Sequence, residues 1–241
     1  MHFIKKYAHN IFLLGVLLLK FIAIACAKDP HNYCVVGLGG NCRVSTWLKA
    51  LNLRFQAFPF DWVESEEIEG LIALINNDFD DYLLLENLTP FFNYYYNRVQ
   101  DRIYKINLVH DFSFQGNENF SFAKHEDFKK GINCINNEYF AVYEKYKKRI
   151  QRFKDLYKNH NQIIFVRVLY IDKDSAILLH KSLKKTFNNK VNIMLIVIND
   201  QEDFKVDWNL EGIKNFYLPT LYLTTDGYEQ HFLAILEGII S

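Results

Sequence analysis

Apolar runs alternate with helical segments through the last third of the chain, and this alternation limits the fold more than any other feature. Gln162–Leu169 and Val191–Ile198 are short apolar runs typical of buried strands, and Ser175–Thr186 between them has the spacing of a helix. Strands that alternate with helices of about 10–15 residues pair in parallel through crossover connections. The sequence therefore predicts an α/β fold, a single layered domain with a central, mostly parallel sheet flanked by helices.

Similar patterns extend toward both ends of the chain. Further strands are predicted at Cys34–Leu38, near Arg102–Phe112 and at Asn215–Leu218, and further helices at Cys42–Leu51, Glu66–Asn76, Tyr139–Tyr157 and Tyr228–Ile240. The tyrosine-rich stretch Phe79–Tyr96 fits neither period. No repeat, low-complexity tract or linker interrupts the chain, so we expect one domain over residues 30–241.

Residues 1–27 have the character of a leader rather than of the domain. Lys5 and Lys6 precede the apolar run Ile11–Leu19, and small residues follow at Ala23-Ile24-Ala25. A basic start, a short apolar region and a small-residue site are typical of a secretory signal peptide. We expect an exported protein, whether secreted, periplasmic or anchored in a membrane by residues 1–27 if they are uncleaved. A cytoplasmic protein with an unusual leader is the alternative.

Charge and cysteine usage exclude several classes of function. Lys+Arg and Asp+Glu balance at 28 each, so no basic excess indicates a nucleic-acid surface. The four cysteines and eight histidines show neither C-x-x-C nor H-E-x-x-H spacing. We therefore expect no metal and no cofactor. One disulfide, Cys34–Cys134, remains open if the protein is exported.

The stretch VVGLGGNCR, residues 35–43, joins a predicted strand to a predicted helix and resembles a phosphate-binding turn. Gly37 and Gly39 fit the first two glycines of G-x-G-x-x-G, but Cys42 occupies the third position. The segment about 20 residues further on, PFDW, does not have the pattern of a second nucleotide-binding strand. Nucleotide binding is therefore the least favoured function of this turn.

Cys42 at the start of the predicted helix has two interpretations. Unpaired backbone N–H groups and the helix dipole favour an anion there, so the position stabilises a thiolate, which is the reactive form of cysteine. The N–H groups near Gly40 are also placed to bind a developing oxyanion. Alternatively, Cys42 is a small residue that fills a tight corner, as free cysteines often do.

A cysteine nucleophile needs a base, and His110 is the best candidate. It follows the apolar run Leu108-Val109, which places it at the end of an element. Neighbouring strand residues point to opposite faces, so Asp111 is a poor choice to orient it. Asp61 lies in the apolar segment PFDW and must be paired there. It is either a buried structural anchor or the third catalytic group.

Several segments in a fixed order carry a resemblance to a known family. They are Val36–Cys42, Phe58–Trp62, Asn77–Phe79, Val109–Phe112, Lys145–Ile150 and Ile164–Arg167. Together they resemble the putative papain-like cysteine peptidases, a bacterial family first catalogued as a domain of unknown function. The resemblance covers about Tyr33 to Ile198. It implies that Cys42 is the nucleophile and His110 the base, with Asp61, Asn41 and Arg167 shaping the site.

Arg167 ends an otherwise apolar strand, where a charge needs an explanation. It either points into a cleft at the carboxyl end of the sheet, where open α/β sheets bind ligands, or pairs with a carboxylate such as Asp172. The cleft is the favoured interpretation.

The leading functional hypothesis is a cysteine-dependent hydrolase, either a peptidase or an acyl transferase, that uses a Cys42–His110 pair on a peptide or glycan-linked substrate. The alternative is a non-catalytic cell-surface domain that binds peptide or glycan, with Cys42 buried.

Overall fold

A four-stranded parallel sheet forms the centre of the protein. The computed structural model describes residues 33–93, 96–116, 125–218 and 228–240. The strands of the sheet, in spatial order, are β1 (Tyr33–Gly37), β6 (Gln162–Val168), β7 (Asn192–Asn199) and β8 (Ile213–Tyr217). Each neighbouring pair runs parallel. The predicted α/β fold around a parallel sheet is confirmed.

Each face of this sheet is covered by helices, because its strands are apolar on both sides. On β6, Ile164, Val166 and Val168 face one layer, whereas Ile163 and Phe165 face the other. The first layer contains α2 (Arg43–Ala50) and α6 (Tyr228–Ile240), and the second contains α3 (Ile68–Asn76) and α5 (Lys173–Thr186). Trp47 of α2 packs against Phe232 of α6 in the first layer, with ring centroids 5.2 Å apart.

A second, antiparallel sheet lies beside the parallel one and corrects the expectation of a single sheet. Its strands, in spatial order, are β2 (Val63–Glu64), β5 (Ile106–Leu108), β4 (Tyr96–Asp101) and β3 (Leu88–Asn93). Only β5 falls in a segment where a strand was predicted. The others were not predicted. β2 has only two residues, and β3 and β4 lie in and after a tyrosine-rich stretch in which apolar and polar residues do not clearly alternate.

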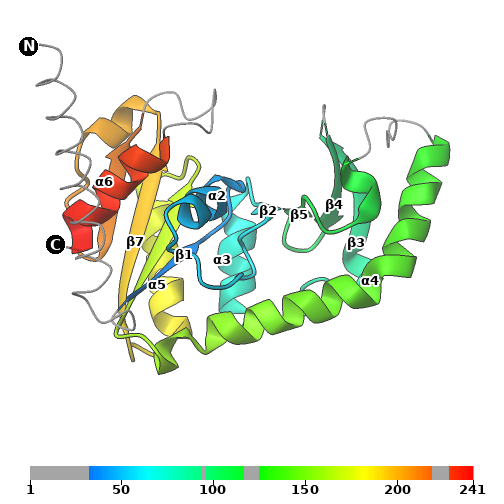
Figure 1. The fold of residues 1–241 in the computed structure, drawn as a ribbon, viewed down its shortest axis with the longest axis horizontal. Helices are drawn as coiled ribbons and strands as arrows, with labels where there is room; N and C mark the ends of the chain where they lie inside the picture. The colour runs from blue at the N-terminus through cyan, green and yellow to red at the C-terminus, as the bar shows by residue number, and fades with distance from the viewer. Residues whose placement is uncertain (1–32, 94–95, 117–124, 219–227, 241) are drawn as a thin grey trace, which may run out of the picture.

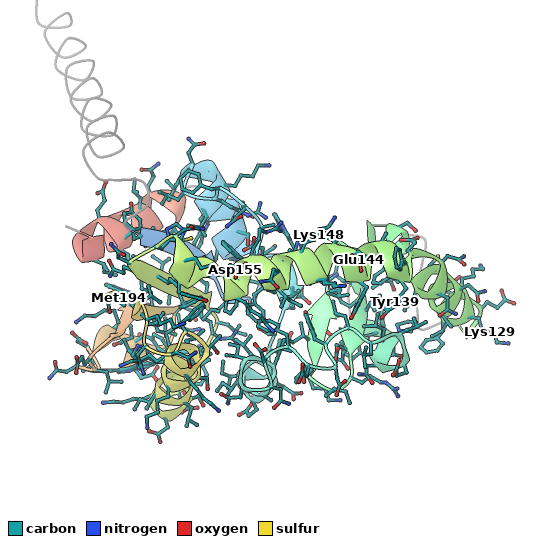
Figure 2. The ribbon with its side chains drawn as sticks, turned by 90° about the horizontal axis from the view of Figure 1, so that it is seen from below. Lys129, Tyr139, Glu144, Lys148, Asp155 and Met194 are labelled. Atoms are coloured by element: carbon teal, nitrogen blue, oxygen red, sulfur yellow. The ribbon has the colours of Figure 1, made fainter. Side chains whose placement is uncertain are left out.

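A single long helix, α4 (His125–Lys154), joins the two sheets. The sequence analysis predicted only its second half, Tyr139–Tyr157, although Phe128, Ile132 and Ile135 continue the same helical spacing toward the N-terminus. Figures 1 and 2 show α4 running along one side of the molecule from the antiparallel sheet to the parallel sheet. Near its end, Phe153 packs edge-on against Phe60, with ring centroids 5.7 Å apart, and contacts Phe165 at the same distance.

Four short 3-10 turns complete the described elements: Leu85–Asn87, Ser113–Gly116, Leu156–Lys158 and Glu202–Lys205. The predicted leader, residues 1–27, lies outside the described residues, so the signal peptide and the anchor stay predictions. Within the part of the chain that the structure describes, no helix is both long and apolar enough to cross a membrane.

Candidate active site

The turn after β1 lies at the carboxyl edge of the parallel sheet and requires its glycines. Leu38 N–H still donates to the carbonyl of Val166 at 2.8 Å, after which the chain turns through Gly39 and Gly40, with φ of 66° and 84°. A Cβ on Gly39 would lie 2.8 Å from Ser65 Oγ, and one on Gly40 would lie 2.8 Å from the carbonyl oxygen of Val168. The backbone therefore approaches both neighbours more closely than any other residue would allow.

Cys42 is the N-cap residue of α2 and is half-buried. Its carbonyl accepts from the N–H of Thr46, which begins the helix, while Asn41 Oδ1 accepts from Arg43 N–H at 3.0 Å. Gly40 N–H is already donated to Ser65 Oγ at 3.1 Å. Among the described residues, the N–H groups of Asn41 and Cys42 have no acceptor. These two amides, and not that of Gly40, are therefore among the donors left for an anion beside the thiol.

Ser65 and Arg167 hold the glycine turn in place through hydrogen bonds. Arg167 is fully buried and donates from Nη1 to the carbonyl of Leu38 at 3.2 Å and to Ser65 Oγ at 3.0 Å, and from Nη2 to the carbonyl of Ser65 at 2.6 Å. Burial lowers the pKa of Arg167 to about 10. Arg167 thus braces the turn that carries Cys42, and it is not open to solvent in a cleft.

Neither alternative considered for Arg167 matches these contacts fully. Asp172 is the N-cap of α5, where its Oδ1 accepts from Ser175 N–H at 2.9 Å, so it is not the partner of Arg167. Ser65 was not anticipated, because a serine followed by two glutamates just before α3 carries no signal that separates it from an ordinary loop residue.

Asp61 is buried and anchors the loop that leads into β2. Its Oδ2 accepts from Nε and Nη2 of Arg54, both at 3.1 Å, and from Phe58 N–H at 2.9 Å. Its carbonyl accepts from Ser45 Oγ at 2.6 Å, which ties the loop to the first turn of α2. The carboxylate is therefore paired, as its apolar setting required, and its partner is Arg54. In the described structure no hydrogen bond joins it to His110.

His110 follows β5 and is exposed. Its ring stands edge-on to the ring of Trp62, with centroids 5.9 Å apart. The guanidinium of Arg54 lies over the same Trp62 ring, 5.1 Å from its centroid. Asp61, Arg54, Trp62 and His110 therefore form a continuous series of contacts. Within the described residues, no hydrogen bond joins His110 to the sulfur of Cys42.

Asp111, next to His110, points into the protein. Its carboxylate accepts from the hydroxyl of Tyr146 at 2.8 Å and pairs with Lys145 Nζ at 2.5 Å, both on α4. The two neighbouring side chains therefore point in different directions, His110 toward solvent and Asp111 toward α4, as expected for adjacent residues at the end of a strand. The HDF segment contributes an anchor for α4 as well as a histidine.

The other described cysteines, Cys34 and Cys134, serve as a comparison for Cys42. Cys34, Cys42 and Cys134 are all free, so the Cys34–Cys134 disulfide considered from the sequence is not formed. Burial, with a smaller effect of the nearby Asp61 charge, raises the pKa of Cys34 to about 12. Among the described residues, no group of three His, Cys, Asp or Glu side chains is arranged to hold a metal ion.

Comparisons with known proteins match most of this chain to one family. Residues 33–201 match the family described as "Putative papain-like cysteine peptidase (DUF1796)". An uncharacterized protein of Acanthamoeba polyphaga mimivirus is 25% identical over 136 residues, which cover 55% of this chain and 60% of the viral protein. The chain thus spans less than two thirds of that relative. No solved structure matches.

Proposed function

Because this chain belongs to the family of putative papain-like cysteine peptidases, we propose that it is a cysteine-dependent hydrolase, a peptidase or acyl transferase, with Cys42 as its nucleophile. The observation that carries the proposal is the setting of Cys42: a half-buried thiol at the N-cap of α2, beside two backbone amides that have no acceptor among the described residues. A helix N-terminus favours the thiolate, and free amides favour the oxyanion that its attack creates.

The proposed reaction follows from these groups. Cys42 Sγ attacks a substrate carbonyl and forms a thioester, while the amides of Asn41 and Cys42 donate to the carbonyl oxygen as it gains negative charge. His110 takes the thiol proton and transfers it to the leaving group. Water, or the acceptor in an acyl transfer, then attacks the thioester and returns the thiol.

His110 must approach Cys42 for this reaction, and the loop of Asp61, which contacts the segments of both residues, supports such an approach. Catalytic hydrogen bonds are often long in unliganded enzymes and tighten when substrate binds. The loop of Asp61 is bonded to α2 through Ser45, and the Trp62 that follows Asp61 contacts His110. The same loop therefore touches both segments, and Asp61 acts on His110 through Arg54 and Trp62 as a positioning residue.

The absence of a Cys42–His110 hydrogen bond in the described structure favours one alternative, a non-catalytic domain that binds a peptide or a glycan. In that case Trp62 and the exposed Phe55, 80% accessible, supply the binding surface. For both the hydrolase and the binding domain, we propose export through residues 1–27 and a peptide or glycan-linked molecule as the substrate or ligand.

Alkylation of the folded full-length chain tests the proposal, with the other cysteines as internal references. Iodoacetamide at neutral pH should modify Cys42 faster than Cys134, and should leave Cys34 unmodified because burial raises the pKa of Cys34 to about 12. Peptide mass spectrometry measures each rate separately. His110→Ala should slow the reaction of Cys42 and leave that of Cys134 unchanged.

A thiol at position 42 that reacts only after unfolding would show that the turn is a packed corner, and the binding domain would then replace the hydrolase. Fast alkylation of Cys42 that is insensitive to His110→Ala would retain the nucleophile and remove His110 as its base.

A further inference from the structure

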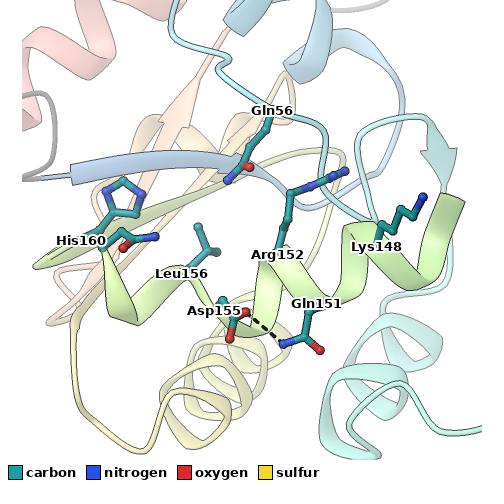
Figure 3. Close-up of a pocket in the computed structure, with 8 residues that line it drawn as sticks. Gln56, Lys148, Gln151, Arg152, Asp155, Leu156 and His160 are labelled. Carbon is teal, nitrogen blue, oxygen red and sulfur yellow. Dashed lines mark hydrogen bonds between the residues drawn. The ribbon is translucent and has the colours of Figure 1, made fainter.

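A hollow of about 420 Å³ lies between the C-terminal end of α4 and the loop after α2. Its lining comes from the loop after α2, from the last turns of α4 and from the segment that leads into β6: Gln56, Lys148, Gln151, Arg152, Asp155, Leu156, Asn159 and His160. Figure 3 shows Gln56 on one side of the hollow and Arg152 and Leu156 on the other. Neither Cys42 nor His110 lines it.

The lining is rich in hydrogen-bond donors. Lys148 is exposed and has no carboxylate partner among the described residues. Arg152 donates from Nε and Nη2 to the carbonyl of Ala57, at 3.1 and 2.7 Å, which fixes the guanidinium against the loop and leaves Nη1 without an acceptor in the described structure. Gln56 and Asn159 add amide groups from the two ends of the hollow.

The carboxylate in the lining does not balance these cations. Asp155 accepts from Gln151 Nε2 at 3.0 Å and pairs with Lys158 Nζ at 2.6 Å. Lys158 is not one of the basic residues that line the hollow. Arg149 is buried, lies over the ring of Tyr146 and has no carboxylate partner among the described residues. Burial and the charge of Arg149 lower the pKa of Arg152, and the charge of Asp61 opposes them. Among the described residues, no carboxylate forms an ion pair with Lys148 or Arg152, so both cations keep donors for an anion.

We propose that this hollow binds a small metabolite through a phosphate group, which Lys148 and Arg152 contact directly. A phosphate offers three terminal oxygens to several donors at once, whereas a carboxylate offers two. The volume exceeds that of inorganic phosphate and falls within the usual range for small-molecule sites, about 300–1,000 Å³. The hollow is thus large enough for a phosphorylated sugar. The inference does not depend on the chemistry of Cys42.

Isothermal titration of the full-length chain with inorganic phosphate and with glucose 6-phosphate tests the proposal at constant ionic strength. Both should bind, the sugar phosphate more tightly because it fills more of the hollow. Lys148→Gln should weaken binding about tenfold or more, the loss expected for one charge-assisted hydrogen bond. Lys147→Gln is the matched control, since Lys147 directly precedes Lys148 on α4, pairs with Glu144 and does not line the hollow.

Four results would overturn the proposal: no heat from either ligand, equal weakening by Lys148→Gln and Lys147→Gln, tighter binding of succinate than of phosphate, or binding of glucose 6-phosphate no tighter than that of inorganic phosphate. The second would indicate attraction to the general charge of α4, and the third a carboxylate site. Circular dichroism of both variants, which change exposed side chains, confirms that they fold. If glucose 6-phosphate binds no better than inorganic phosphate, the site is for the free anion and the metabolite is excluded.

Discussion

His180 lies on α5 with its ring against the turn that begins β8. Its Nε2 is 3.2 Å from the carbonyl oxygen of Ile193, and a Cβ on Gly212 would lie 2.6 Å from the ring. Burial lowers the pKa of His180 and the hydrogen bond to the Ile193 carbonyl opposes it, with smaller effects of Lys184, which lowers the pKa, and Glu211, which raises it. The folded protein therefore disfavours the charged imidazole.

This pKa shift predicts a loss of stability in mild acid. Below the unfolded-state pKa of about 6.5 the unfolded chain takes up a proton that the folded chain resists, so the free energy of unfolding falls as the pH drops. Urea unfolding at about pH 7.5 and about pH 5.5 should show a smaller decrease for His180→Gln than for the wild type. Equal decreases would assign the acid sensitivity to other groups.

At the scale of elements, α4 is held to the segment after β5 by one buried carboxylate. Asp111 accepts from the hydroxyl of Tyr146, and burial, followed by the nearby charge of Asp111, raises the pKa of Tyr146 well above its usual value. The phenol therefore stays protonated and serves as a permanent donor. Since His110 precedes Asp111, the same bond limits how far the histidine can move relative to α4.

Tyr146→Phe should lower the free energy of unfolding by about 1–2 kcal/mol, because it removes a buried hydrogen bond to a charged group and leaves the ring in place. Tyr143→Phe is the control: Tyr143 lies one turn earlier on α4, and its hydroxyl has no hydrogen-bond partner among the described residues. Urea denaturation measures both variants. An equal, small effect of the two substitutions would mean that Asp111 is satisfied by Lys145 alone.

At the scale of the whole molecule, the two sheets share one apolar core, in which α3 makes the closest approach. Gly70 on α3 packs against the backbone of Tyr104, in the turn between β4 and β5, and a Cβ there would lie 1.9 Å from the carbonyl oxygen of Tyr104. This contact brings the antiparallel sheet directly onto a helix of the parallel layer. Only glycine permits that distance.

Gly70→Ala should therefore destabilise the protein by about 3 kcal/mol or more, since relief of the clash requires α3 and the antiparallel sheet to separate. Gly238→Ala is the matched substitution on α6, where an added Cβ meets nothing within 4 Å. It should raise stability by about 0.5–1 kcal/mol through helix propensity. Thermal unfolding of both variants checks the contrast. Comparable effects at the two positions would show that the sheets are not tightly coupled.

Prediction from the sequence succeeded where local pattern and burial coincide. The strands at Gln162–Val168 and Asn192–Asn199 are apolar on both faces, and the terminal helix Tyr228–Ile240 was predicted with its observed bounds. The antiparallel sheet was missed for two reasons. β2 has only two residues and pairs with a distant segment, Val63 with Leu108, and such a pairing has no local signature. β3 and β4 form a hairpin in which Asn93 pairs with Tyr96, but their residues show no clear alternation of apolar and polar side chains.

The candidate site divides in the same way. Cys42 could be identified because a glycine turn between a strand and a helix is a local pattern. The roles of Asp61 and Arg167 could not be settled, because each depends on a partner brought close by folding: Arg54 for the carboxylate and Ser65 for the guanidinium. Ser65 has no sequence signal at all. Catalysis by Cys42 and His110 stays a prediction.

The sequence by itself determined the parallel sheet, the helix that begins at Cys42 and the family to which the chain belongs, because these depend on residue order and on spacing within short segments. Only the tertiary structure decided that a second sheet shares the core, that Arg167 braces the glycine turn through Ser65, and that Gln56 borders one hollow with Arg152. These features depend on contacts between residues far apart in the chain, whose geometry arises only when the whole core packs.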